Sequence, residues 1–177
     1  MTFDKRDKIE ILENALSWIV VMAMLIYGGA KIIQFDGASE INTPVSELTG
    51  MQLMWAFYGH SKPFALTLGF FEITGGLLIL FKKTRILGCL FTSTILVNVI
   101  LQDIFYDINR GALIAAIIYQ ICIIIILLLN RVQIINSLRL LLKKTSLGQT
   151  TTKFFAKLGI AFILFVLLRI TEFYLTH

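Results

Sequence analysis

Four apolar runs stand out in the pattern of hydrophobic and polar positions along the chain. Each holds 17 to 20 residues and at most one charge: Asn14 to Ala30, Pro63 to Phe81, Ile86 to Gln102 and Gly111 to Asn130. A transmembrane helix needs about 20 predominantly apolar residues. The pattern therefore predicts four membrane-spanning helices. Short polar connections join the second to the third and the third to the fourth, so these helices are expected to be antiparallel neighbours.

A fifth run, from about Phe154 to Tyr174, is less uniform. Its central 11 residues, Leu158 to Leu168, carry no charge. Lys157 and Arg169 flank them at positions where long side chains can reach the two membrane interfaces. We interpret this run as a fifth transmembrane helix, with an interfacial or re-entrant segment as the alternative.

The fold class that follows is an all-α membrane protein: an antiparallel four-helix transmembrane bundle, a fifth C-terminal transmembrane helix and short interfacial helices. Residues 1–130 form the bundle and include an outer loop at 35–62. Residues 131–152 form a cytoplasmic amphipathic segment with a polar linker, and residues 153–177 hold the fifth helix.

The outer loop is too long for a simple turn and is expected to hold a helix of its own. Thr43 followed by Pro44 is typical of a helix N-cap and first helical position. Apolar residues then recur at helical spacing: Leu48, Met51, Met54, Trp55 and Tyr58. Because Trp and Tyr are enriched at membrane interfaces, we interpret Trp55 and Tyr58 as interface anchors in preference to parts of a lid over a substrate.

Composition and charge agree with a membrane protein and predict its orientation. Of the 177 residues, 57% are hydrophobic and 15% are charged, which lies outside the usual range for soluble domains. Lys and Arg gather in the N-terminal segment, in the turn at 82–85 and in the segment 131–157. Since positive residues stay on the cytoplasmic side, the N-terminus is expected inside and the C-terminus outside. The net charge of +5 is then a topology signal, with weak support for contact with anionic lipid and none for nucleic acid.

Glu72 lies at the centre of the second apolar run, where an ionised carboxylate costs roughly 2.5 kcal/mol or more. It persists there only if it faces a protein interior or is neutral. Its helical face also carries Ala65, Leu68, Gly69, Gly75, Gly76 and Ile79, and the opposite face carries Phe70, Thr74, Leu77 and Phe81. Small residues permit close helix packing. The Glu72 face is therefore predicted to meet other helices, and the phenylalanines to meet lipid.

Polar side chains on the other predicted helices complete a candidate functional network around Glu72. They are Tyr27 and Lys31 near the end of the first helix, Asn98, Gln102, Asp103 and Asp107 on or just after the third, and Tyr119 on the fourth. The direction of each helix puts Lys31 and the two aspartates at the outer end, with Glu72 about 13 Å deeper, from nine residues at ~1.5 Å each. This predicts a polar funnel that opens outward and ends near Glu72.

The same residues have an equally physical structural interpretation. Lys31 could pair with Asp103 or Asp107, and Glu72 could bond to Asn98 or Tyr119. Such a network would only determine which helices meet. Both interpretations stay open on sequence grounds.

No cofactor site is legible in the sequence. His60 lies in the outer loop and His177 is the last residue, so they form no haem ligand pair within the membrane. A flavin fingerprint, a P-loop and a metal-ligand cluster are absent. Cys89 and Cys122 lie inside predicted helices outside any Cys-x-x-Cys motif and are expected to be small buried hydrophobes. Redox activity would need a quinone or a cofactor held by a partner.

The first helix ends in Tyr27-Gly28-Gly29-Ala30-Lys31, and the second reads Gly69-Phe70-Phe71-Glu72-Ile73-Thr74-Gly75-Gly76, followed by Thr84-Arg85 and Gly88. In these segments the chain resembles the DoxX-like family of small membrane proteins. The resemblance covers roughly residues 10 to 130. It implies a four-helix bundle in the bacterial cytoplasmic membrane and marks Lys31, Glu72 and Arg85 as family-pattern positions. It also implies kinship with subunits of quinone-linked oxidoreductases and with assembly factors, while the fifth helix and long outer loop depart from the family's minimal pattern.

Three functions are consistent with these features. The first is an accessory subunit of a quinone-linked membrane redox system, with a membrane or peripheral redox partner and Glu72 relaying a proton. The second is a small proton-coupled transporter, although no inverted repeat or broken helix supports it. The third is a scaffold or assembly factor whose glycine-rich helix faces hold other membrane proteins. The sequence predicts neither the substrate nor the oligomeric state, and it leaves open whether the protein is an enzyme.

Overall fold

A computed structural model describes residues 2–142 and 151–176 of the chain. It separates into two compact units, Met1–Ser137 and Leu138–His177. Every regular element in the described residues is helical, and no strand occurs in them. The all-helical prediction is therefore confirmed.

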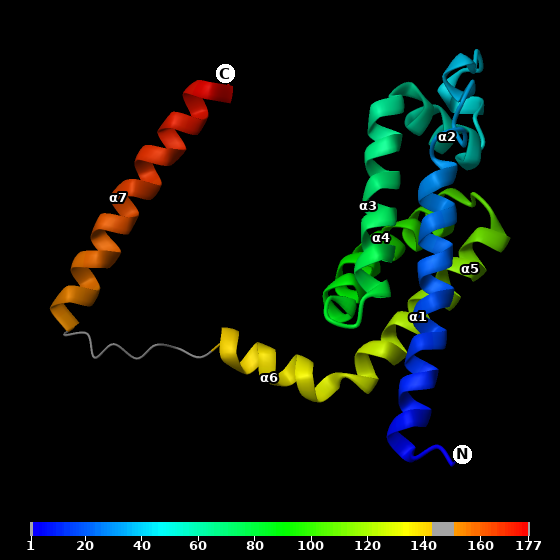
Figure 1. The fold of residues 1–177 in the computed structure, drawn as a ribbon. Coiled ribbons are helices and arrows are strands. Elements are labelled where there is room, and N and C mark those ends of the chain that lie inside the picture. Colours follow the sequence, from blue (N-terminus) through cyan, green and yellow to red (C-terminus); the bar gives the residue numbers. More distant parts are fainter. Residues whose placement is uncertain (1, 143–150, 177) are drawn as a thin grey trace. The chain divides into compact units, whose positions relative to one another are not determined.

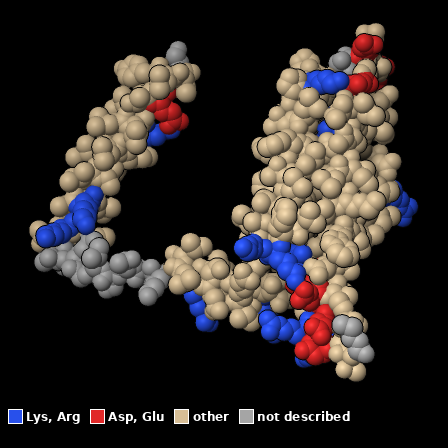
Figure 2. All heavy atoms as spheres, viewed as in Figure 1, with Lys and Arg blue, Asp and Glu red and all other residues tan. Residues whose placement is uncertain are grey.

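The first unit holds four long helices at the places where the apolar runs predict them. They are α1 (Lys5–Ala30), α3 (Lys62–Leu80), α4 (Arg85–Tyr106) and α5 (Arg110–Leu129). Each is long and apolar enough to cross a membrane. On the face drawn in Figure 2, the charged side chains of this unit gather at its two ends, and the surface between them is almost wholly uncharged.

These four helices contact one another in a ring. Helix α1 packs against α3 and α5, and α4 packs against the same two helices (Figure 1). The fully buried side chains of Val20, Ile79, Ile123 and Ile126 fill the space between them. One end of the ring holds the short helix α2 and is called the α2 end below. The other end holds the turn between α3 and α4 and is called the Lys82 end.

Glycines allow α1 and α3 to approach closely. A Cβ on Gly28 would lie 2.6 Å from the carbonyl oxygen of Gly69, well inside van der Waals contact. Gly75 and Gly76 are likewise buried, against Thr92 of α4 and Met24 of α1. The predicted packing face of α3 is thus confirmed. Helices α1 and α4 of the same chain pack against its glycines.

The opposite face of α3 also follows the prediction. Phe70 and Phe81 are 62% and 63% exposed, and Leu77 is 43% exposed, whereas Glu72 is 5% exposed. Thr74 departs from the pattern because it is half-buried. Large apolar side chains with this much exposed surface are what a helix facing lipid presents.

The outer loop contains a helix, but it begins later than predicted. Pro44 precedes a single 3-10 turn, η2 (Val45–Glu47), and the chain then becomes extended at Leu48. Helix α2 (Gly50–His60) begins after Thr49, whose side chain accepts from the backbone N–H of Gln52 while the Gln52 side chain accepts from the backbone N–H of Thr49. This reciprocal capping box satisfies more of the free N–H groups at a helix start than Thr43 and Pro44 offer. A second 3-10 turn, η1 (Ala38–Glu40), precedes it in the loop.

Helix α2 is held against the end of α4. A Cβ on Gly50 would overlap the carbonyl oxygen of Tyr106, so only glycine fits this contact. Asp107 then takes a left-handed conformation, with φ of 45°, and ends α4. Asn109 caps α5 by accepting from the backbone N–H of Ala112 at 2.9 Å. These contacts close the α2 end of the bundle.

Two further helices lie in the C-terminal part of the chain. Helix α6 (Arg131–Leu141) matches the predicted amphipathic segment. Helix α7 (Thr151–Thr176) matches the fifth apolar run and is long and apolar enough to cross a membrane. Most of the predicted polar linker at 145–152 lies outside the described residues.

Candidate functional site

A cavity of about 450 Å³ lies in the first unit, toward the α2 end. Helices α1, α2, α3, α4 and α5 and the turn after α1 all contribute to its wall. Its polar and aromatic lining residues are Tyr27, Lys31, Gln34, Phe35, Trp55, Tyr58, Glu72, Thr94, Asn98, Gln102, Asp103, Asn109 and Tyr119. The apolar part of the wall includes Met24, Leu68, Ile95, Leu96 and Val99. The cavity therefore has a polar, aromatic lining and an apolar wall.

An ion pair between α1 and α3 forms one side of the cavity. Lys31 Nζ lies 3.5 Å from Glu72 Oε1, and the two side chains are 12% and 7% exposed. The same ammonium group donates a hydrogen bond to Gln34 Oε1 at 3.0 Å and lies 5.6 Å from the centre of the Phe35 ring. The Lys31 ammonium group therefore interacts with Glu72, Gln34 and Phe35.

This pairing corrects two sequence-based expectations. Lys31 was expected at the outer end, beside Asp103 or Asp107 and about 13 Å above Glu72 by ~1.5 Å per residue. Helix α1 ends at Ala30, and the next residue, Lys31, lies beside Gly69: a Cβ on Gly69 would lie 3.0 Å from Cβ of Lys31. Glu72 follows Gly69 by about one turn of α3, so the Lys31 side chain can reach it.

Two buried carboxylates in the cavity wall each leave an oxygen unpaired. Glu72 Oε2 and Asp103 Oδ2 are inaccessible and accept no hydrogen bond from any described residue. Asp103 as a whole is 7% exposed. A buried acceptor without a donor costs roughly 1–3 kcal/mol, and more when it is charged. Each oxygen therefore needs a donor: its own proton, or a water molecule or ligand in the cavity that reaches it when the wall shifts.

A chain of hydrogen bonds crosses from α2 to α4 at the cavity mouth. The Tyr58 hydroxyl donates to Gln102 Oε1 at 2.7 Å, and the Gln102 amide donates to Asn98 Oδ1. Burial raises the pKa of the Tyr58 phenol, although the hydrogen bond to Gln102 acts in the opposite direction. Tyr58 therefore remains a protonated donor at neutral pH.

Aromatic rings form the rest of the wall. Phe35 stacks on Tyr58 with ring centres 5.0 Å apart and meets Trp55 edge-on at 5.2 Å. Tyr27 and Tyr119 meet edge-on at 6.3 Å across α1 and α5. Such rings offer flat apolar surface, and the phenol groups add donors and acceptors.

The structure brings together most of the predicted network. Glu72, Lys31, Tyr27, Asn98, Gln102, Asp103 and Tyr119 all line the cavity. Asp107 does not, because its backbone ends α4 and its side chain is exposed. The suggested bonds from Glu72 to Asn98 or Tyr119 are replaced by the pair with Lys31.

Six polar and aromatic lining residues lie outside the predicted network: Gln34, Phe35, Trp55, Tyr58, Thr94 and Asn109. The sequence-based interpretation makes Trp55 and Tyr58 interface anchors and singles out neither Phe35 nor Asn109. Phe35 follows the first helix directly, and Asn109 precedes the fourth, so the signal was their position at the expected outer end. The loop folds back over the bundle, which places these side chains in the cavity wall.

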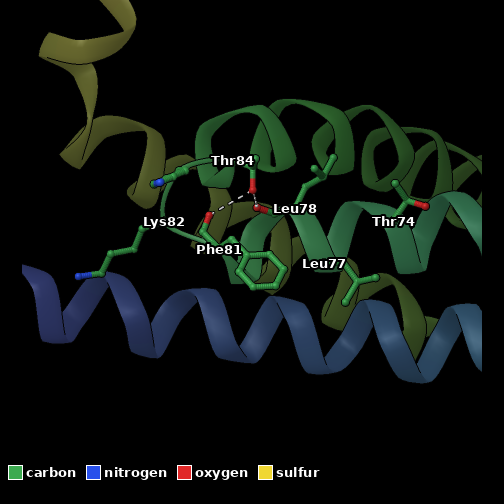
Figure 3. Close-up of a pocket in the computed structure, with 7 residues that line it drawn as sticks. Thr74, Leu77, Leu78, Phe81, Lys82 and Thr84 are labelled. Atoms are coloured by element: carbon green, nitrogen blue, oxygen red, sulfur yellow. Dashed lines mark hydrogen bonds between the residues drawn. The ribbon is translucent and has the colours of Figure 1, made fainter.

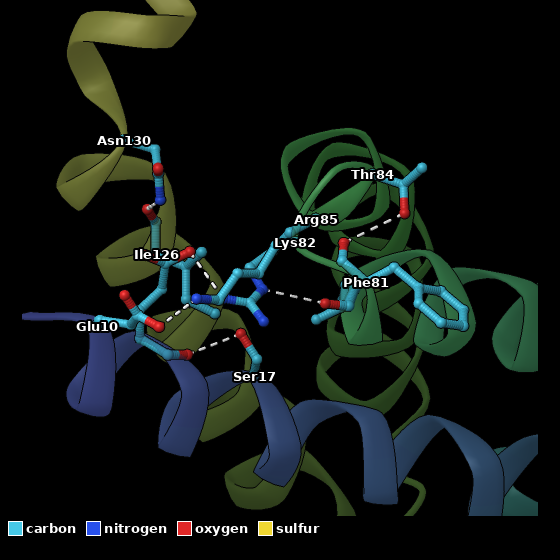
Figure 4. Close-up of polar contacts among 10 residues, drawn as sticks. Glu10, Ser17, Phe81, Lys82, Thr84, Arg85, Ile126 and Asn130 are labelled. Carbon is cyan, nitrogen blue, oxygen red and sulfur yellow. Dashed lines mark hydrogen bonds and ion pairs between the residues drawn. The ribbon is translucent and has the colours of Figure 1, made fainter.

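A second buried ion pair lies at the Lys82 end. Arg85, labelled in Figure 4, is 3% exposed. Its Nη1 donates to Glu13 Oε1 at 2.9 Å, and its Nε donates to the carbonyl oxygen of Ile79 at 3.1 Å. Ser17 donates to the carbonyl oxygen of Glu13 at 2.7 Å. The contacts of Arg85 therefore join α1, α3 and α4.

Cys89 and Cys122 are free and buried, as expected for small hydrophobes.

Over residues 2–142 and 151–176, these observations define an all-helical protein with five helices long and apolar enough to cross a membrane and a cavity inside the first unit. No protein-family profile matches the chain, and no solved structure matches it. The chain is similar to uncharacterized protein YwoB of Bacillus subtilis (strain 168), with 32% identity over 104 residues. The match covers 57% of this chain and 66% of that protein, just under two thirds of its length. The resemblance to the DoxX-like family stays a prediction.

Proposed function

We propose that the protein is an accessory subunit of a membrane redox system and binds a quinol in the cavity beside Glu72. In this proposal α1, α3, α4 and α5 cross the bacterial cytoplasmic membrane as an antiparallel bundle, with the α2 end outside. The observation that carries the proposal is the pair of unpaired carboxylate oxygens, Glu72 Oε2 and Asp103 Oδ2, in the wall of one cavity.

The size of the cavity supports a small-molecule ligand. Binding sites for such molecules are typically clefts of about 300–1,000 Å³ with a mostly apolar wall and a few placed polar groups. The cavity, at about 450 Å³, lies within that range. It has room for one substituted ring and the start of an apolar tail.

The unpaired oxygens favour the reduced form of such a ring. A quinol has two O–H donors, which can satisfy buried carboxylate oxygens. An oxidised quinone has acceptors in their place and would leave Glu72 Oε2 and Asp103 Oδ2 unpaired. Since each unpaired buried acceptor costs roughly 1–3 kcal/mol, the quinol should bind more tightly.

The aromatic and apolar lining supports the rest of the ligand. The rings of Tyr27, Tyr119 and Phe35 offer flat surfaces for an aromatic ring. Met24, Leu68 and Ile95 offer an apolar wall for a side chain of the ligand. Amphiphilic ring compounds need both surfaces in one cavity.

The proposed chemistry divides between this chain and a partner. When a quinol is oxidised to a quinone, it releases two protons and two electrons. Glu72 and Asp103 would accept the protons, with the Lys31 ammonium group compensating the charge of Glu72. The two electrons would pass to a redox partner that holds the cofactor.

A second candidate is a carrier or sensor of a small organic cation. Glu72 and Asp103 outnumber Lys31, so the cavity wall has a net charge of −1 when all three are ionised. Aromatic walls attract cations through their π-faces, by about 0.5–2 kcal/mol. A scaffold role has less support, because Gly69, Gly75 and Gly76 already pack against helices of the same chain.

Equilibrium binding to the full-length protein in detergent tests the proposal. The ligands are a short-chain quinol, the matching quinone and a quaternary amine of similar size. We expect the quinol to bind at least about tenfold more tightly than the quinone, and Asp103→Asn to remove most of that preference, since one charged hydrogen bond is worth about 1.5–3 kcal/mol.

Asp107→Asn is the matched control. It makes the same chemical change four residues away, on a side chain outside the cavity wall, and asparagine tolerates the left-handed backbone there. Its affinities should equal those of the wild type. Tightest binding of the amine would replace the redox proposal by the carrier, and absence of saturable binding for all three ligands would overturn both.

A further inference from the structure

A second hollow lies at the Lys82 end of the bundle and shares no lining residue with the cavity. It measures about 550 Å³ and is lined by Thr74, Leu77, Leu78, Phe81, Lys82, Lys83 and Thr84 (Figure 3). All seven belong to the last two turns of α3 and the turn that follows. We call this feature the Lys82 groove.

The groove has a fixed shape because the turn at its end is tied to α3. Helix α3 ends at Leu80, and Phe81 takes an extended conformation with φ of −89° and ψ of 124°. The Thr84 hydroxyl donates to the carbonyl oxygens of Leu78 at 2.8 Å and of Phe81 at 3.3 Å. The chain therefore bends at a set position, and the exposed side chains of Phe81 and Leu77 both line the groove.

Two ammonium groups stand at the end of this apolar trough. Lys82 forms an ion pair with Glu10, and both side chains are more than half exposed. No described acidic residue forms an ion pair with Lys83, which is also exposed. The rim of the groove therefore holds two positive charges and one neighbouring carboxylate. An apolar trough that ends in excess positive charge matches a molecule with an apolar chain and an anionic head.

We propose that the Lys82 groove is a binding site for an anionic phospholipid. One acyl chain lies along Leu77, Leu78 and Phe81, and the phosphate of the headgroup meets Lys83 and Lys82. The turn at 82–85 belongs to the segments predicted to face the cytoplasm, where the leaflet surface is negative and attracts juxtamembrane basic residues. A soluble anion would use the lysines alone and would have no need of the trough.

Native mass spectrometry of the full-length protein tests the site. The protein is released from detergent with equal amounts of phosphatidylglycerol and phosphatidylcholine that have identical acyl chains. The wild type should retain phosphatidylglycerol preferentially. Lys83→Gln should lower the preference about fivefold, from roughly 1 kcal/mol for each basic residue near an anionic surface, and Lys82→Gln with Lys83→Gln should remove it.

A matched double variant separates a site from net charge. Lys5→Gln with Lys8→Gln removes the same two charges from the N-terminal segment, where both lysines are exposed and outside the groove. This variant should keep the wild-type preference. An equal loss in both double variants would overturn the site in favour of diffuse attraction.

A bulky substitution tests the apolar half of the groove with no change in charge. Leu77→Trp should fill the trough and lower phosphatidylglycerol retention, whereas Leu128→Trp, at a side chain 61% exposed on α5, should not. Equal retention of the two lipids by the wild type, or an unchanged lipid profile in Leu77→Trp, would overturn the proposal.

Discussion

The two ends of the bundle each contain a buried ion pair, but the pairs differ in how completely their atoms are satisfied. At the Lys82 end, Arg85 is bonded to Glu13 and to a backbone carbonyl at 2.9 and 3.1 Å. Toward the α2 end, Lys31 lies 3.5 Å from Glu72, whose second oxygen accepts no hydrogen bond from the described residues. The first pair is adjacent to packed helices and the second to a cavity.

This difference separates a structural pair from a candidate site. Charges removed from water are stabilised only when geometry is good and their remaining hydrogen-bonding groups are satisfied. Arg85 and Glu13 approach that condition. Glu72 and Asp103 do not, so a donor from outside the chain would complete them.

The largest effect is expected at the satisfied pair. Arg85→Met should lower the free energy of unfolding by about 3–5 kcal/mol, because it leaves Glu13 partly buried without its partner. Unfolding in mixed micelles with increasing SDS measures it. Lys82→Gln breaks the exposed pair with Glu10 and should change stability by less than about 1 kcal/mol. Equal effects of the two variants would contradict the interpretation that the buried pair of Arg85 and Glu13 stabilises the fold.

The next effect concerns the approach of α1 to α3, which brings Lys31 to Glu72. Gly28→Ala should lower stability by about 1–3 kcal/mol, because the new Cβ would lie 2.6 Å from the Gly69 carbonyl oxygen and force the helices apart. Gly29→Ala is its neighbour and control. Its Cβ would have no atom within 4 Å, so the better helix propensity of alanine should raise stability by up to about 1 kcal/mol. Thermal unfolding of both variants in one detergent compares them.

A substitution toward the α2 end, where Asp103 has an unpaired oxygen, should change stability in the opposite direction. Asp103→Asn in ligand-free protein should leave stability unchanged or raise it by about 1 kcal/mol, because it removes a buried charge that lacks a donor. The same SDS titration measures this variant. A loss of 3 kcal/mol or more would mean that Asp103 is a structural partner like Glu13, and the contrast between the two ends would disappear.

The smallest effect is expected at the cavity mouth. Tyr58→Phe removes the hydrogen bond to Gln102 at 2.7 Å while keeping the ring stacked on Phe35. Stability should fall by about 0.5–1.5 kcal/mol, the usual net value of one hydrogen bond. With Trp18 replaced by Phe, Trp55 emission during the same unfolding titration reports whether α2 separates before the long helices do. No change in stability would indicate that the bond to Gln102 is not formed in solution.

Much of the fold was predictable because long apolar helices are encoded locally. Run length alone located the long helices, and the 3.6-residue period placed Glu72 with Gly69 and Gly75 on the buried face and Phe70 on the exposed one. The late start of α2 was also encoded locally. The segment Thr49 to Gln52 has the capping-box spacing, a stronger start signal than Thr43 with Pro44.

The contacts within the site were less predictable, because they depend on how far each helix slides along its neighbour. Lys31 meets Glu72 because α1 ends level with Gly69, which is a tertiary property that no single helix reveals. Trp55 and Tyr58 line the cavity because the outer loop folds back over the bundle. Trp and Tyr occur both at membrane interfaces and at cavity mouths, so the sequence does not distinguish the two positions.

The most direct test is an experimental structure of the protein purified from its native membrane in mild detergent. Our account predicts non-protein density in the cavity, with a donor atom within about 3.2 Å of Glu72 Oε2 or Asp103 Oδ2. Side chains of the protein filling that space and donating to both oxygens would contradict it.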